Sequence, residues 1–382
     1  MPRKRKKLLF LVTEDWYFYS HRISLACAAK EAGYDVVVVT NIHEHGTKIR
    51  EYGLTLINLD FKRRKKNPFS AIATIKQIIN IYSREKPYIV HHVSLKPVIL
   101  GSIASYICKV PYIINTLTGL GSVFVSESFL DKLIKILIFE PILGLLFKRK
   151  NSYTIVQNID DKKRLLALGV VRNERTYLIR GSGVNIDLFT HEPERDEEPI
   201  VLFAARMIKD KGVEEFIKAA RQLYKENINA RFVLAGDIDP DNPSSMNKKE
   251  LMKWHEAGII EWWGYKDDMQ NIFKKVHIIC LPSLYGEGLP KVLLEGAASG
   301  RSLIASDIPG CREIVRNGEN GFLVPAKNTD ALVDAIKKLI ENKSLRENMG
   351  KKGRELVETD FSSEKINNET IDLYKYIEEL EN

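Results

Sequence analysis

Two carboxylates and two cations in the second half of the chain have types and spacing that could do chemistry. Glu287 and Glu295 bracket the run Glu-Gly-Leu-Pro-Lys-Val-Leu-Leu-Glu, and Arg206 and Lys211 lie upstream in Arg-Met-Ile-Lys-Asp-Lys-Gly. Cations pair with phosphates, whereas carboxylates accept hydrogen bonds from hydroxyl groups. The combination predicts a site for a nucleotide diphosphate that carries a sugar, and sugar transfer as its chemistry.

The two cations fall where an anion site is expected. Arg206 and Lys211 follow a predicted strand at 200–204 and precede a helix that opens at Gly212. Free N–H groups and the dipole at a helix N-terminus favour negative charge. We therefore expect both side chains to bind a diphosphate, the alternative being two solvated loop cations.

Glu287 lies in a loop flanked by glycines. Gly286 and Gly288 let the backbone approach a ligand closely, and Pro290 suits the first position of a helix. The N–H groups of Gly288 and Leu289 would then point at the ligand. We expect Glu287 to reach a sugar hydroxyl.

Glu295 lies two turns deeper, within a helix predicted over Pro290–Ala298. The helix is largely apolar, so it is expected to be largely buried, and a buried acid needs a partner. We expect Glu295 to bind a ribose hydroxyl. The alternative is an ordinary acid on a helix surface.

The first half of the chain carries weaker signals. Thr13–Arg22 follows the first predicted strand, where such domains bind ligands, but it lacks the G-x-G-x-x-G pattern of a dinucleotide site. A glycine-containing loop at Thr118–Gly121 follows a later strand. A structural or solvated role is an equal alternative for the cations here. The residues proposed to bind an acceptor are Asp15, His21, Arg22, Lys96, Thr118 and Gly119.

No metal or cofactor is expected. Asp237-Ile-Asp239 has the Asp-x-Asp form of a metal-binding pair, but it leads into a loop rich in proline and asparagine, and we interpret it as a loop. The four cysteines are scattered without a Cys-x-x-Cys. This pattern argues against zinc and disulfides and is typical of a reducing cytosol.

Alternating strands and helices must position these residues. Strands are predicted at 8–12, 36–40, 55–59, 88–92 and 112–116, and again at 200–204, 231–235, 259–262, 277–281 and 302–305. This rhythm predicts an α/β chain of two doubly wound Rossmann-like domains that face each other across a cleft. We expect an N-terminal domain at 1–190, an acidic linker at 191–199, a C-terminal domain at 200–360, and a last helix at 361–382 that packs back on the first domain.

The charge is unevenly distributed. Residues 1–190 hold 30 lysines and arginines against 15 acids, a balance of +15, whereas residues 191–382 hold 28 against 35, a balance of −7. A basic half indicates an anionic partner such as nucleic acid, a membrane surface or a phosphorylated substrate. The basic residues lack the interleaved aromatic residues of a nucleic-acid stacking platform, apart from Trp16–Tyr19.

Two segments favour a membrane surface. Phe61–Phe69 is a basic run framed by phenylalanines, and Phe129–Lys150 is apolar. Charges and Pro141 within the second segment argue against a membrane span and favour a monotopic or packing role. The alternative is two core helices broken at Pro141. Nothing at the N-terminus resembles a signal peptide.

These motifs resemble glycosyltransferase family 4, the retaining GT-B enzymes, over nearly the whole chain. The resemblance rests on the Ala-Ala-Arg that ends at Arg206, on Lys211-Gly212, on Leu281-Pro-Ser283 and on the Glu-x7-Glu pair. Gly310-Cys-Arg-Glu313, Asn317–Phe322 and Gly183-Val-Asn185 also match, the last with Asn in place of the family's Asp. Lys66–Phe69 and Gly119–Ser122 resemble the branch that acts on undecaprenyl-diphosphate-linked sugars, although Trp16–Arg22 replaces the glycine-rich loop of many members.

The resemblance implies a role for each site residue. Arg206 and Lys211 would hold the donor diphosphate, Glu287 would contact the transferred sugar, and Glu295 would hold the ribose. Catalytic roles are thus implied for Glu287, Arg206 and Lys211. The donor-binding set is Arg206, Lys211, Gly286, Glu287, Gly288, Leu289, Pro290, Glu295 and Lys266.

The resemblance also implies a reaction. We expect a bacterial hexosyl- or N-acetylhexosaminyltransferase that moves a sugar with retention, without metal, from a nucleotide-diphosphate sugar to a lipid-linked saccharide. The expected donor is UDP-linked. It would work in cell-surface polysaccharide assembly, in the cytoplasm, peripherally on the inner face of the plasma membrane. The alternatives are a nucleotide-sugar epimerase or a phosphorylase on the same fold, a transferase with a soluble acceptor, and a nucleic-acid or membrane-binding protein.

Overall fold

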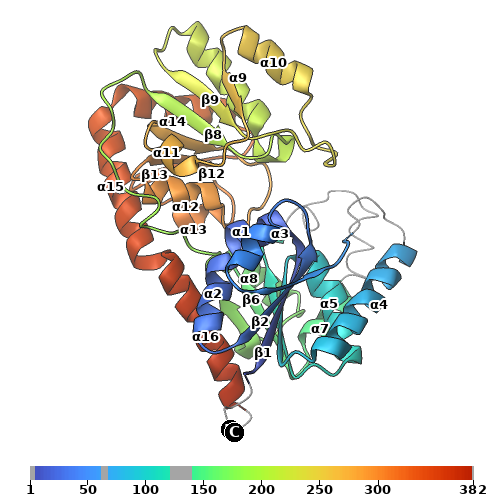
Figure 1. Cartoon of the computed structure of the whole chain (residues 1–382). Helices are drawn as coiled ribbons and strands as arrows, with labels where there is room; N and C mark the ends of the chain where they lie inside the picture. The colour runs from blue at the N-terminus through green and yellow to red at the C-terminus, as the bar shows by residue number, and fades with distance from the viewer. Residues whose placement is uncertain (1–4, 62–67, 121–139, 381–382) are drawn as a thin grey trace. The chain divides into compact units, whose positions relative to one another are not determined.

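The computed structural model describes residues 5–61, 68–120 and 140–380, which form two compact units (Figure 1). Unit 1 comprises Met1–Ser182 together with Ser363–Asn382, and unit 2 comprises Gly183–Ser362. Each unit is built on its own parallel sheet.

The sheet of unit 1 has seven strands in the order β3-β2-β1-β4-β5-β6-β7, all paired in parallel. The order reverses between β1 and β4, which makes this the switch point of the sheet. The strands are β1 (Lys7–Glu14), β2 (Asp35–Asn41), β3 (Thr55–Asn58), β4 (Ile89–Val93), β5 (Tyr112–Leu117), β6 (Ser152–Val156) and β7 (Thr176–Leu178).

Helices cover both faces of this sheet, so its central strands β4 and β5 are buried along their whole length. α2 and α16 pack together on one face, and α4 and α5 pack together on the other (Figure 1). The helices of unit 1 are α1 (Asp15–His21), α2 (Ile23–Glu31), α3 (Gly46–Glu51), α4 (Pro68–Glu85), α5 (Leu95–Ile107), α7 (Glu140–Phe147), α8 (Ile159–Ala167) and α16 (Ser363–Glu379).

Buried polar contacts accompany the apolar packing of α16 in unit 1. The Tyr374 hydroxyl lies 2.6 Å from Nδ1 of His91 on β4, and the Asn367 amide donates to Ser24 on α2 at 2.5 Å. Burial lowers the pKa of His91 well below its usual value, and Arg22 lowers it further. His91 therefore joins this network as a neutral imidazole.

The sheet of unit 2 has six parallel strands in the order β10-β9-β8-β11-β12-β13, with its switch point between β8 and β11. The strands are β8 (Ile200–Ala204), β9 (Arg231–Ala235), β10 (Glu261–Gly264), β11 (Ile278–Leu281), β12 (Ser302–Ser306) and β13 (Gly321–Val324). The helices are α9 (Val213–Lys225), α10 (Lys248–Glu256), α11 (Met269–Phe273), α12 (Lys291–Ala298), α13 (Cys311–Ile314), α14 (Thr329–Glu341) and α15 (Lys343–Asp360).

The acidic segment 191–199 differs from the linker expected there, since it lies within unit 2. Glu194 is buried against Arg346 at 3.0 Å, and Glu192 accepts Lys274 at 2.7 Å. Acidic residues of this segment therefore pair with basic residues of unit 2, and the segment is not an exposed linker. Of the two segments expected at a membrane surface, residues 62–67 and 129–139 lie outside the described residues.

Candidate functional site

Two loops at the carboxyl edge of the unit 2 sheet are held against each other. They follow the neighbouring strands β8 and β11, so both leave the sheet at its switch point. Gly212 has φ +80°, and a Cβ there would lie 1.9 Å from the Pro282 carbonyl oxygen. The Leu284 N–H also donates to the Asp210 carbonyl at 2.9 Å. Only glycine allows this approach, which brings Lys211 to the second loop.

Lys211 and Glu287 form an ion pair across these loops. Lys211 Nζ lies 2.5 Å from Glu287 Oε1, and their side chains are 24% and 15% exposed. The hydroxyl of Ser283, which is fully buried, donates to the same oxygen at 2.8 Å. Glu287 is thus fixed by two donors on one oxygen. Sequence reasoning noted Ser283 only as part of a motif and missed this contact.

The other predicted cation has a partner that was not expected. Arg206 Nη1 lies 2.6 Å from Oδ2 of Asp239, in the loop after β9. Asp239 belongs to the Asp-x-Asp that we interpreted as a plain loop. Among the described residues, no group of three or more His, Cys, Asp or Glu could hold a metal ion. In this structure Asp239 pairs with the Arg206 cation.

The Glu287 loop enters α12 in a fixed conformation. Gly310 has φ +77°, and a Cβ there would lie 2.2 Å from the Gly288 carbonyl oxygen and 2.6 Å from that of Glu287. Gly310 thus lets the β12 loop support the backbone of the site. Pro290 is the N-cap of α12 and not its first residue, a difference of one position because its ψ of 114° is extended. By contrast, a Cβ on Gly286 would meet open space.

Glu295 has the partner that its burial requires. Its side chain is 12% exposed and accepts Lys291, one turn earlier on α12, at 3.2 Å. Burial raises the pKa of Glu295, and Lys291 opposes that rise. Lys266 lies exposed in the loop after β10, outside these contacts.

In unit 1, a polar cluster lies at the switch point. Tyr17 on α1 interacts with Arg22 and with Thr118 after β5, and Thr118 lies 3.2 Å from Ser94 after β4. His21 stacks on Tyr17 with ring centroids 4.2 Å apart. The structure thus brings together three of the six acceptor candidates: Arg22, Thr118 and His21.

Arg22 is the unusual member of this cluster. It is 4% exposed, and its Nη1 donates to the Gly181 carbonyl at 3.4 Å. Within the described part of the chain its Nε and Nη2 have no hydrogen-bond partner of good geometry. A buried cation normally pairs with an acid, so its unsatisfied nitrogens make Arg22 a candidate for binding an anion.

Two other acceptor candidates take part in different contacts. Asp15 is fully buried and accepts the backbone N–H groups of His43 and His45 at 2.7 and 3.0 Å, which ties α1 to the loop after β2. Lys96 lies over the Phe61 ring at 5.8 Å, and burial lowers its pKa. Gly119 has φ +111°, beside Thr118.

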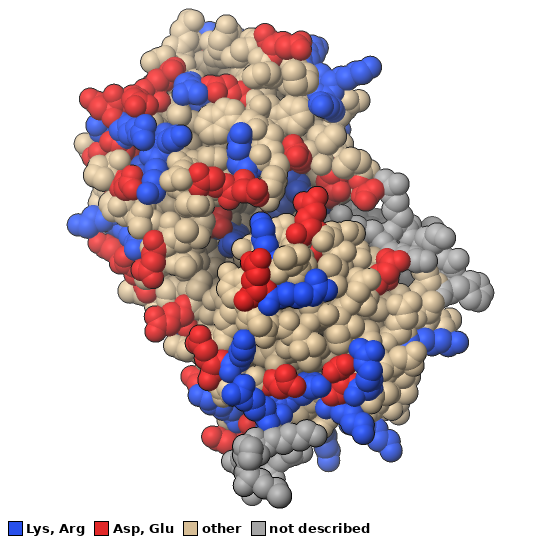
Figure 2. All heavy atoms as spheres, in the orientation of Figure 1, with Lys and Arg blue, Asp and Glu red and all other residues tan. Residues whose placement is uncertain are grey.

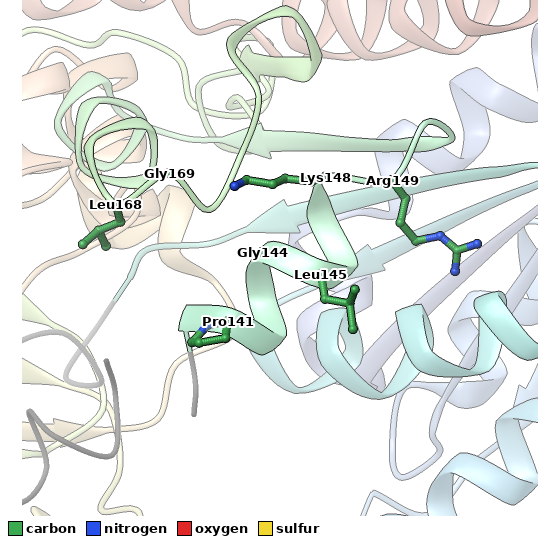
Figure 3. Close-up of a pocket in the computed structure, with 7 residues that line it drawn as sticks. All are labelled: Pro141, Gly144, Leu145, Lys148, Arg149, Leu168 and Gly169. Carbon is green, nitrogen blue, oxygen red and sulfur yellow. The ribbon is translucent and has the colours of Figure 1, made fainter. Parts of the chain in front are cut away.

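An open depression of about 670 Å³ lies elsewhere on unit 1, between α7 and the end of α8 (Figure 3). In Figure 3, Lys148 extends toward the turn at Gly169, and Arg149 points away from it. Leu145 in this depression is 77% exposed. No helix within the described ranges is long and apolar enough to cross a membrane.

Comparisons with known proteins agree with this geometry. The family described as Glycosyl transferases group 1 matches residues 186–356, and Glycosyl transferase 4-like matches residues 7–158. The N,N'-diacetylbacillosaminyl-diphospho-undecaprenol alpha-1,3-N-acetylgalactosaminyltransferase of Campylobacter jejuni is 29% identical over 346 residues, covering 87% of this chain and 89% of the relative.

Two further relatives extend the match. The UDP-Gal:alpha-D-GlcNAc-diphosphoundecaprenol alpha-1,3-galactosyltransferase of Escherichia coli is 26% identical, covering 80% of each chain. The crystal structure of Anabaena HepE in complex with UDP and glucose superposes with a TM-score of 0.76 at 17% identity, covering 97% of this chain and 100% of that one. Together with the two parallel-sheet units, these matches identify the chain as a glycosyltransferase with the GT-B fold, whose two halves are similar to the glycosyl transferase 4-like and group 1 families.

Proposed function

We propose that this glycosyltransferase uses a UDP-sugar donor and transfers the sugar with retention to an undecaprenyl-diphosphate-linked saccharide. The observation that carries the proposal is the Lys211–Glu287–Ser283 constellation at the unit 2 switch point. The names of the Campylobacter and Escherichia relatives support the acceptor, and the Anabaena structure with UDP supports the donor.

In this proposal the donor diphosphate binds Arg206 and Lys211. Cleavage of the anomeric bond leaves growing negative charge on the leaving diphosphate, and fixed cations stabilise that charge without reorganisation. The two cations supply the charge that a metal would otherwise supply, so we propose that transfer needs no metal. Glu295 accepts a hydrogen bond from the ribose.

Glu287 contacts the transferred sugar. Oε1 is occupied by Lys211 and Ser283, which orients the carboxylate and leaves Oε2 for a sugar hydroxyl. The anomeric configuration of the sugar is then retained if the acceptor attacks from the face that the diphosphate leaves. This route needs no covalent intermediate on the protein.

The acceptor binds unit 1 in this proposal. The switch point between β1 and β4 is where an open parallel sheet binds ligands, and Arg22 is a buried cation with unpaired nitrogens there among the described residues. We assign Arg22 to phosphoryl oxygens of the lipid-linked diphosphate, with Tyr17 and Thr118 beside it.

A lipid acceptor also requires approach to a membrane. On α7, Ile142 is 42% and Leu145 is 77% exposed, and Lys148 and Arg149 follow one turn later (Figure 3). Basic side chains also gather on unit 1 near the C-terminus of the chain (Figure 2). Exposed apolar groups on α7 and basic residues just after its end suit the surface of an anionic leaflet. We propose that α7 docks there, on the cytoplasmic face.

The test is binding followed by turnover. Thermal shift against a panel of nucleotide sugars should identify the donor, because a ligand that binds only the folded state raises the melting temperature. The identified donor is then incubated with an undecaprenyl-diphosphate saccharide, with and without EDTA. Transfer that is unchanged by EDTA is the expected result. Donor conversion without an acceptor would instead indicate an epimerase.

A further inference from the structure

The Arg206–Asp239 pair is better built than an ordinary surface salt bridge. The Asp239 side chain is only 13% exposed, whereas that of Arg206 is 45% exposed, and the two atoms lie 2.6 Å apart. A pair of freely moving surface side chains contributes little because both must be ordered. Here the acid is already ordered by the fold.

Backbone contacts fix the loop that carries Asp239 to the loop that carries Arg206. The Met207 N–H donates to the Asp237 carbonyl at 2.9 Å, and the Met246 N–H donates to the Met207 carbonyl at 2.8 Å. Ile208 and Ser245 form an antiparallel bridge, and the Asp239 N–H donates to the Ser245 hydroxyl at 3.1 Å. The separation between the Asp239 backbone and the Arg206 backbone is therefore set before any ligand binds.

We propose that Asp239 is a positioning residue that orients the Arg206 guanidinium for the donor diphosphate. This inference rests on the proposed function, in which Arg206 binds that diphosphate. Arginine has five N–H donors in a planar fork. Asp239 accepts from Nη1, and the remaining donors stay available to phosphate oxygens. Ordering the side chain in advance lowers the entropy lost when the diphosphate binds.

Two other roles for Asp239 make opposite predictions. If Asp239 were a metal ligand within Asp-x-Asp, its neighbour Asp237 would share the role and donor binding would depend on a divalent cation. If it were a counter-ion that competes with the diphosphate, its removal would strengthen donor binding. The loop contacts favour the positioning role, since they hold the Asp239 backbone in place without a metal or a bound ligand.

A double-mutant cycle tests the proposal. UDP binding is measured by calorimetry for the native protein, Asp239→Ala, Asp239→Asn, Arg206→Ala and the double variant Arg206→Ala with Asp239→Ala. Asp237→Ala is the matched control, because it removes the same charge from the same loop and its carboxylate has no hydrogen-bond partner among the described residues. Melting temperatures confirm that each variant folds.

We expect Asp239→Ala to weaken UDP binding by about tenfold, Asp239→Asn by less because its amide oxygen still accepts from Nη1, and Asp237→Ala not at all. In the Arg206→Ala background, the Asp239→Ala change should have almost no further effect, because Asp239 acts through Arg206. With donor sugar, KM should rise more than kcat falls.

Three results would overturn the inference. Equal weakening by Asp239→Ala in both backgrounds would show a general loop effect, and tighter UDP binding would show a competing counter-ion. Binding that requires Mg²⁺ or Mn²⁺ and is lost in Asp237→Ala as well would show a metal site. Failure of the native protein to bind UDP, GDP, ADP or TDP would instead refute the proposed function, and this inference with it.

Discussion

Glu287→Gln should separate the chemical role of this carboxylate from its structural one. The substitution keeps the size of the side chain and an oxygen for the Ser283 hydroxyl, but it removes the charge that Lys211 contacts at 2.5 Å. Both partners are partly buried, at 24% and 15% side-chain exposure. Loss of the charge should therefore cost about 1–3 kcal/mol of stability, more than an exposed pair would.

A loss of that size predicts a fall of a few degrees to about 10 °C in the melting temperature, so the variant remains folded at 25 °C. Turnover should change far more. If Glu287 contacts the sugar in the transition state, kcat should fall at least about 100-fold, comparable with removal of a transition-state hydrogen bond elsewhere. UDP lacks the sugar, and Lys211 is released from its acid, so UDP affinity should not weaken.

The assays are transfer kinetics with the identified donor and calorimetry with UDP. Ser283→Ala serves as a graded control, since it removes only the second donor to Oε1 and should lower kcat by a smaller factor. A fully active Glu287→Gln variant would refute the assignment of Glu287 to the sugar. A variant that keeps kcat and loses UDP affinity would refute the separation of roles between Glu287 and the cations.

Three further predictions follow from single contacts. Gly212→Ala should lower the free energy of unfolding by about 2–4 kcal/mol, because φ is +80° and the new Cβ would lie 1.9 Å from the Pro282 carbonyl oxygen. The control is Gly286→Ala, whose new Cβ would meet open space. Its melting temperature, measured by the same scanning calorimetry, should lie within a few degrees of that of the native protein. Glu295→Gln should weaken UDP binding. Because burial raises the pKa of Glu295 in the fold above its usual value of 4.5, native protein should lose stability relative to the variant as the pH rises from that usual value through the raised pKa, which thermal melts across this range would measure. Arg22→Met should raise KM for the lipid-linked acceptor and leave UDP affinity unchanged, whereas a parallel loss of both would contradict the assignment to the acceptor.

The sequence predicted most of the sheet cores correctly because parallel strands are buried on both faces and are therefore continuously apolar. The strands at 200–204 and 231–235 match β8 and β9 without a shift. α15 was missed because it is rich in charged residues, and few of its side chains are buried. Thr13–Arg22 was expected to bind ligand after the first strand, and most of this segment forms a helix, α1 (Asp15–His21), that the sequence pattern did not indicate.

The sequence predicted which residues form the candidate site, but not which of them contact each other. The glycines and acids of the Glu287 loop are local signals, and they identify the loop without a structure. The Lys211–Glu287 and Arg206–Asp239 pairs join residues 76 and 33 positions apart. Such pairs depend on strand order, because only neighbouring strands bring their loops together. The order of strands in a sheet cannot be predicted from the local sequence pattern.

The most direct test of the central claim is the anomeric configuration of the product. An α-linked donor and an undecaprenyl-diphosphate saccharide are incubated with the native enzyme, and the new linkage is determined by NMR. We predict an α-linked saccharide that forms only when donor and acceptor are both present. A β-linked product, or donor conversion without acceptor, would contradict the account.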